Sequence, residues 1–209
     1  MASSHQHRFA GGFHLSRRNR STTDGTLAAA DSAAVTATSI RDIATATLRV
    51  VLGFVFLWAF LDKTFGLGYA TKSGKAWIDG ARPTEGFLSR VDVGPMAGTL
   101  RGWAGDPWAD WLFMLGLLGI GIAVILGIGL RIAAVSGTVM MALMWIAEWP
   151  PAKHSESGAA TMSTNPFADY HVIYALALIA LAATAAGTRY GLGTWWSERP
   201  FVKKYAWLR

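Results

Sequence analysis

The chain of 209 residues is 52% hydrophobic and only 15% charged, a balance that favours an integral membrane protein over a soluble domain of this size. Its net charge of +6 does not indicate nucleic-acid binding, because the Lys and Arg residues lie mainly in the two tails and one long connection and do not form one stripe with interleaved aromatic residues. The absence of cysteine excludes disulfides, CxxC redox chemistry, thiolate-ligated metal sites and a thiol nucleophile.

The first 40 residues are rich in Ser, Thr, Ala and Gly, carry four arginines and lack a sustained apolar run. This composition predicts a disordered basic tail over 1–40. His5, His7 and His14 lie in it, but histidines without a fixed geometry do not make a metal site. We therefore expect no bound metal.

The first predicted span covers 43–61, where nineteen residues between two aspartates carry one charge, Arg49. That length suits a hydrocarbon core of about 30 Å at about 1.5 Å per residue. Five residues, spaced four, three, four and three positions apart, form one stripe along this helix: Arg49, Gly53, Phe56, Phe60 and Lys63. We expect this stripe to face protein. An arginine at this depth either snorkels to the headgroups or contacts a carbonyl or acid on another helix.

The polar connection from Asp62 to about Asp110 is too long for a simple turn. It predicts two short helices, one after Pro83 with Thr84 as its cap and one over 95–103. Four tryptophans suggest that the connection lies at a membrane interface: Trp77, Trp103, Trp108 and Trp111.

Two further spans follow over 111–130 and 132–149, and their very short link predicts an antiparallel hairpin. Small residues in the first of them, Gly119, Ala123 and Gly127, have the spacing that allows close backbone approach.

A fourth span is expected over 170–187, before a basic aromatic tail over 191–209. The predicted fold is thus an all-α membrane protein. It is a four-transmembrane-helix antiparallel bundle over 41–190 with a long external first connection that contains short interfacial helices.

Residues 41–190 resemble the DoxX family of bacterial membrane proteins. The resemblance rests on the four short spans, the long first connection and a first-helix motif made of Arg49, Gly53, Phe56, Lys63 and Gly66. The runs FLWAFLDKTFGLGYAT and TNPFADYHVIYAL are similar to an actinobacterial branch of that family.

The resemblance implies a four-helix bundle in the cytoplasmic membrane. The namesake proteins resemble subunits of thiosulfate:quinone oxidoreductase, so membrane quinone is the implied carrier. The helical periodicity itself does not indicate quinone.

Chain direction brings several ionisable residues to the external ends of the helices in an antiparallel bundle. We predict that a pocket roofed by the connection over 77–108 binds a substrate or quinone headgroup, and that it is formed by Asp62, Lys63, Glu148, His171 and Tyr174. Asp169 lies at the same level. The alternative is that these residues gather at helix ends only because water is there.

Two functions remain open. The first is a membrane subunit of a redox system that passes electrons from a periplasmic or membrane donor, such as a reduced sulfur compound, to quinone. The second is a non-catalytic scaffold or assembly subunit of a respiratory or redox complex, which the lack of flavin and nucleotide fingerprints favours. Expected partners are the lipid bilayer and other subunits of such a complex, and no nucleic acid.

The charge distribution predicts that both tails are cytoplasmic. With four spans, eleven Lys and Arg residues lie on the tail side, seven lie in the two opposite connections and the remaining one is Arg49. This excess follows the positive-inside rule.

A cysteine at Ser155 should therefore react with an impermeant maleimide added to intact cells, and one at Ser197 should not. The native chain has no cysteine and gives no background. Labelling at Ser197 alone would show that the orientation is the opposite of the predicted one. Labelling at both positions would contradict the predicted number of spans.

Overall fold

The computed structural model describes residues 18–209, and their side chains from residue 31 onward. The chain forms two compact units, one ending at Arg41 and the other comprising Asp42–Arg209. Helix α1 (Arg18–Phe65) begins in the first unit and continues into the second. Residues 18–40 are therefore helical, unlike the disordered tail predicted there, because the alanines among them favour a helix. The rest of the predicted tail, 1–17, lies outside the described residues.

The described residues are helical and form no β-strand, apart from one isolated bridge between His154 and Ala160. Three helices are long and apolar enough to cross a membrane: α1 from Asp31 onward, α4 (Pro107–Leu126) and α5 (Leu130–Glu148). The described residues therefore establish an all-helical fold with three candidate membrane spans.

Helix α6 (Tyr170–Ala183) has 14 residues and is shorter than the span predicted over 170–187. It rises about 21 Å, less than the roughly 30 Å of a hydrocarbon core. The helix ends because Ala185 adopts a left-handed conformation with φ of 49°, and the chain continues in turns. A bundle of four full-length helices is not confirmed.

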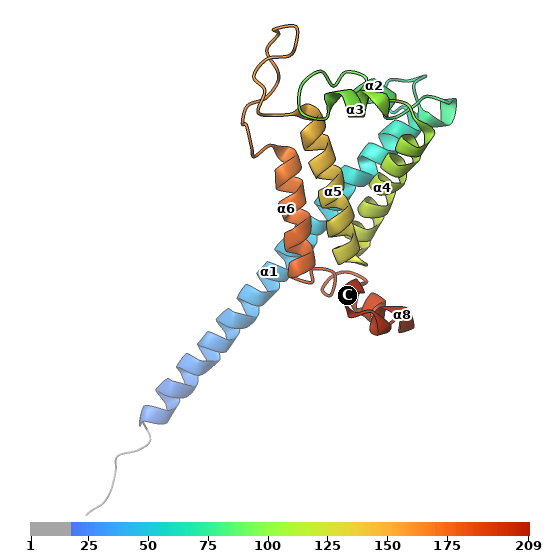
Figure 1. Cartoon of the computed structure of the whole chain (residues 1–209). Helices are drawn as coiled ribbons and strands as arrows, with labels where there is room; N and C mark the ends of the chain where they lie inside the picture. The colour runs from blue at the N-terminus through green and yellow to red at the C-terminus, as the bar shows by residue number, and fades with distance from the viewer. Residues whose placement is uncertain (1–17) are drawn as a thin grey trace, which may run out of the picture. The chain divides into compact units, whose positions relative to one another are not determined.

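Helices α4 and α5 form the predicted antiparallel hairpin. Their link is three residues long, and both of its glycines, Gly127 and Gly129, have left-handed φ values of 73° and 55°. Helix α5 also packs along α6, as Figure 1 shows, so α5 lies between two neighbours.

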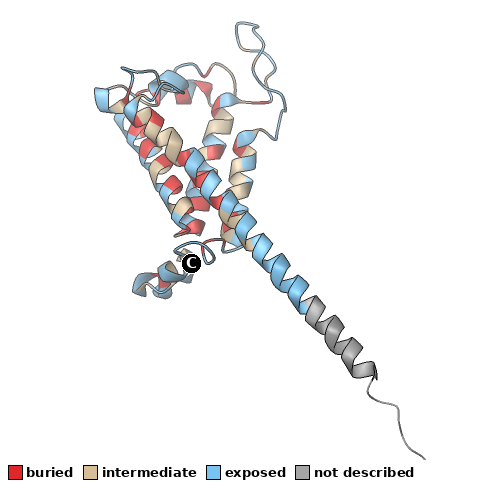
Figure 2. Ribbon diagram, turned by 180° about the vertical axis from the view of Figure 1, so that it is seen from behind, coloured by how far each residue is buried: buried red, intermediate tan, exposed pale blue. Residues whose placement is uncertain are grey.

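The main core of the second unit is built from inward faces of α1, α4, α5 and α6, which appear as the red stripes in Figure 2. On α1, Arg49, Gly53 and Phe56 are buried, while Phe60 and Lys63 are half-buried. The prediction that this stripe faces protein is confirmed.

Two glycines allow the backbones of α1 and α4 to touch. A Cβ added at Gly53 would lie 2.8 Å from the backbone nitrogen of Ile125, and one at Gly121 would lie 2.7 Å from that of Leu57. A Cβ at Gly119 would meet nothing within 4 Å. The close contact with the α1 backbone is therefore made by Gly121 and not by Gly119. Of the predicted stripe, Gly127 is closely packed, against Arg49 and the backbone of Gly187.

The Arg49 side chain joins α1 to the chain that follows α6. It is 1% exposed, and its Nη2 donates a hydrogen bond of 2.5 Å to the carbonyl of Tyr190. Gly127 and Gly191 lie so close to the guanidinium that a Cβ on either would collide with it, and Gly187 packs against the backbone of Gly127. Of the two alternatives, the side chain makes contact with a carbonyl and does not extend outward, but that carbonyl lies in the turns after α6 and not on another helix. We call this arrangement the Arg49 clasp.

The long connection holds three short helices, η1 (Trp77–Asp79), α2 (Glu85–Leu88) and α3 (Ala97–Gly102). Thr84 precedes α2 as predicted, but its hydroxyl donates to Asp110 Oδ1 at 2.7 Å and does not cap the helix. A small second core includes Val91, Leu100 and Ala147, which attaches the connection to the end of α5.

The C-terminal segment folds into α7 (Gly193–Ser197), α8 (Pro200–Lys204) and η2 (Ala206–Leu208). Among the described elements, η2 contacts α5 and α8.

Gly53→Leu should destabilise the protein, because its side chain must displace backbone atoms of α4. Overpacking of this kind costs about 1–3 kcal/mol or more. The midpoint of thermal unfolding in detergent, followed by tryptophan fluorescence, should fall clearly. Gly119→Leu is the matched control and should not lower it; an equal fall in both would show that the crossing is not the cause.

Arg49→Leu should loosen the chain after α6, because the hydrogen bond to Tyr190 is lost. A hydrogen bond to a charged group contributes about 1.5–3 kcal/mol, so local opening should rise about tenfold or more. Trypsin cleavage after Arg189 measures this opening, with cleavage after Lys204 as the internal control. Arg49→Lys should give an intermediate rate, because an ammonium lacks the planar fork. Unchanged cleavage in Arg49→Leu would contradict the clasp.

Candidate functional site

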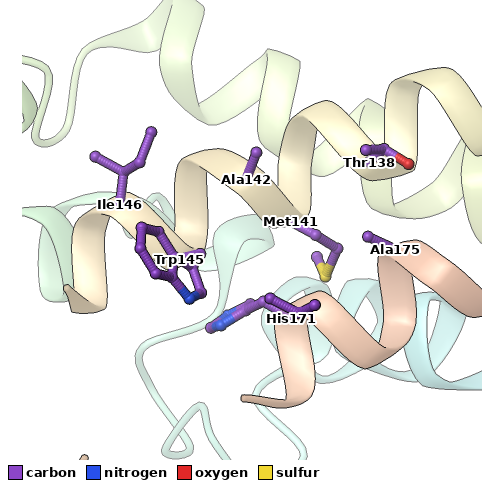
Figure 3. Close-up of a pocket in the computed structure, with 8 residues that line it drawn as sticks. Thr138, Met141, Ala142, Trp145, Ile146, His171 and Ala175 are labelled. Carbon is purple, nitrogen blue, oxygen red and sulfur yellow. The ribbon is translucent and has the colours of Figure 1, made fainter. Parts of the chain in front are cut away.

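A cavity of about 270 Å³ lies between the second half of α5 and the first turns of α6. The described residues that line it come from these two helices alone and are mostly apolar: Thr138, Met141, Ala142, Trp145, Ile146, His171, Val172 and Ala175 (Figure 3). We call it the α5–α6 cavity. Figure 3 shows the Trp145 indole and the His171 ring extending from facing helices toward the same space.

His171 lies in the first turn of α6 and is 1% exposed. Its Nδ1 is 2.8 Å from Oδ2 of Asp169, while Oδ1 of Asp169 accepts hydrogen bonds from the backbone N–H groups of His171 and Val172. Asp169 therefore caps the helix and also orients the ring. With the proton on Nδ1, the neutral imidazole presents Nε2 as an acceptor.

Two buried polar atoms without a hydrogen-bond partner belong to residues that line this cavity. They are Nε2 of His171 and Oγ1 of Thr138. Among the described residues, Arg49 also has buried side-chain nitrogens without a hydrogen-bond partner. Because burial of an unpaired polar group is costly, each such group calls for an explanation.

Thr138 differs from other hydroxyl residues in these helices. Thr64, Ser136 and Thr184 each donate to the carbonyl four residues earlier, at 2.7, 2.8 and 2.8 Å. That local bond is the usual way for a hydroxyl inside a helix to be satisfied. The hydroxyl of Thr138 is therefore buried without the usual local hydrogen bond.

A polar cluster lies beside the histidine at the C-terminal end of α5. The hydroxyl of Tyr170 donates to Oε1 of Glu148 at 2.6 Å. Ligand atoms of Glu148, Asp169 and His171 lie within 4.8 Å of one another and could hold a metal ion, which the sequence did not predict. Both carboxylates already accept hydrogen bonds from the protein, so the cluster also has an explanation without a metal.

Glu148 and His171, two of the predicted pocket residues, are brought together. Tyr174 lies one turn further along α6, and its ring centroid is 6.0 Å from that of Tyr170 and 6.4 Å from that of Phe56. Tyr174 thus packs at the edge of the core.

Asp62 and Lys63 have other contacts. The carboxylate of Asp62 accepts from the backbone N–H groups of Tyr69 and Thr71, at 3.3 and 2.8 Å, and so closes the loop after α1. The ammonium of Lys63 lies 6.0 Å from the Phe113 ring centroid. The predicted roof is also wrong for this cavity, because its described lining includes nothing from the connection over 77–108.

Sequence reasoning did not select Thr138, Met141 or Trp145 as site residues. Steps of three and four place them on one face of α5, which is also the pattern of an ordinary packing face. The signal that was available is the single hydroxyl on that face, opposite a histidine on the next helix.

No protein-family model, curated protein or solved structure matches this chain.

Proposed function

We propose that this chain is a membrane subunit of a redox system that binds a quinone headgroup in the α5–α6 cavity. The observation that carries the proposal is that two residues lining one apolar cavity, His171 and Thr138, each have a buried polar atom without a hydrogen-bond partner. A quinone ring fits this pattern because it is flat and apolar and carries an oxygen at each of two opposite ends.

The arrangement of the helices supports a bundle of four crossings in the cytoplasmic membrane with both tails on one side. Tyr170 is bonded to Glu148 at the end of α5, and the backbone of Gly187 touches that of Gly127 at the end of α4. The segment over 170–187 therefore covers the same depth as α5, partly as helix and partly as turns. The resemblance to the DoxX family implies the same organisation, with four crossings and both tails on one side.

The size and position of the cavity agree with a ligand that arrives through the bilayer. Its volume of about 270 Å³ is near the lower end of small-molecule pockets, which suits one ring better than a larger ligand. Ala142 is exposed on the outer face of α5 and lines the cavity. An isoprenoid tail can leave past Ala142 and remain among the lipid chains.

The polar residues have distinct roles in this proposal. Thr138 donates its hydroxyl proton to one carbonyl of the ring. Nε2 of His171 faces the other oxygen, where it accepts a proton from a hydroxyl or, when charged, donates one. Asp169 stabilises the charged imidazole through Nδ1–H. A bound quinone supplies a carrier for two electrons and two protons. A partner subunit or a reduced sulfur compound is the proposed electron donor.

The proposal is tested by the affinity of the purified full chain for a short-chain naphthoquinone. Thr138→Val should weaken binding several-fold, because a hydrogen bond contributes about 1 kcal/mol. His171→Gln should weaken it about tenfold or more, because the Asp169-oriented acceptor is lost. Thr64→Val is the control, since it removes a buried hydroxyl that is already paired.

Equal affinities in all these variants would refute the site. If the wild-type chain binds no quinone and co-purifies with stable partners after mild extraction, the scaffold function replaces the redox function.

A further inference from the structure

A second cavity, of about 450 Å³, forms an apolar groove on the outer surface of α4 and α5. Its lining includes Leu112, Leu115, Gly119, Ala123, Ile132 and Trp196. Leu112, Leu115 and Gly119 are exposed, so the groove is open along its side. None of these residues lines the α5–α6 cavity.

The groove is at least as long as one leaflet of a bilayer. On α4 its lining runs from Leu112 to Ala123, eleven positions apart or about 16 Å along the helix, and it continues to Gly129 and Trp196 beyond the end of α4. A hydrocarbon core is about 30 Å thick, so each leaflet contributes about half of it. A single acyl chain of the leaflet at the C-terminal end of α4 therefore has the right length to lie in the groove.

Trp196 connects the groove to the C-terminal segment. Its indole N–H donates to the carbonyl of Leu208 at 2.8 Å, and Nη1 of Arg131 donates to the carbonyl of Ala206 at 3.2 Å. These bonds hold the last residues beside the first turn of α5, at one end of the groove.

The C-terminal segment has the composition of a surface that contacts lipid headgroups. Residues 189–209 contain five Lys and Arg residues and one acidic residue. Lys203, Lys204 and Arg209 are exposed, as is Arg131. Half-exposed aromatic side chains accompany them, including Trp195 and Phe201, each 49% exposed. Basic and aromatic residues together are typical of protein at the headgroup level.

We propose that the groove and the C-terminal segment bind one anionic phospholipid. An acyl chain lies along α4 and α5, and the phosphate lies near Arg131 and the exposed cations of the last seven residues. The positive excess selects an anionic headgroup over a zwitterionic one. This site is independent of the proposed quinone site.

The test uses the purified full chain and native mass spectrometry with phosphatidylglycerol and phosphatidylcholine of identical acyl chains. The wild type should retain one phosphatidylglycerol with a several-fold preference. Neither inorganic phosphate nor glycerophosphoglycerol should displace it, because neither carries a chain for the groove. Displacement by either would reduce the site to a phosphate site, and equal retention of both lipids would refute it.

Gly119→Leu fills the groove and should abolish retention of both lipids. A Cβ at Gly119 meets nothing within 4 Å, so the new side chain displaces no protein atoms near the backbone. Gly98→Leu is the matched control on α3, where the space is equally open. Ser136→Leu fills the same groove from α5 and serves if the first variant fails to fold. Undiminished lipid in a folded groove variant would contradict the proposal.

A triple variant tests the headgroup separately. Lys203→Gln with Lys204→Gln and Arg209→Gln should make the retention of the two lipids equal, while a lipid still occupies the groove. Lys72→Gln with Lys75→Gln and Arg90→Gln removes the same number of exposed charges from the long connection and should leave the preference intact. A dimer that Gly119→Leu dissociates would instead identify a second copy of the chain as the occupant, and a retained quinone would identify an isoprenoid tail.

Discussion

The contact on which the second unit depends is the approach of α1 to α4 at Gly53 and Gly121, where no Cβ separates the two backbones. In a membrane, helix association cannot rely on water leaving apolar surface, so close packing has to supply the attraction. This crossing sets how closely the face of α1 that carries Arg49 and Phe56 packs against the other helices. Phe56 can then fill the core at 2% exposure, and Arg49 can reach the chain beyond α6.

Much of the helical framework was predictable because it depends on local patterns. The length of the apolar run before Asp62 predicted a span, and its periodicity predicted that Arg49 and Phe56 would be buried. The very short link between the second and third apolar runs predicted the hairpin. The end of α6 was not predictable in this way, because no Pro or Gly marks Ala183 and the turns after it are held by contacts with distant segments.

The site was predictable only in part, for the same physical reason. Chain direction alone places Glu148 beside the start of α6, and the structure has their side chains in one cluster. Chain direction places Asp62 at the same end of the helices as Glu148. The loop after α1 nevertheless folds back, and its backbone N–H groups use both oxygens of Asp62. The position of Thr138 opposite a histidine was visible in the sequence, but its unpaired state was not, because whether a hydroxyl is satisfied depends on the rotamer it adopts and not on the residue type.

The Arg49 clasp joins residues that are 141 positions apart in the chain. During synthesis, the N-terminal segments of a protein are made first. A first span that inserted on its own would therefore carry Arg49 into the bilayer before its partner exists. The hydrogen bond from Arg49 can form only after the chain has been made as far as Tyr190.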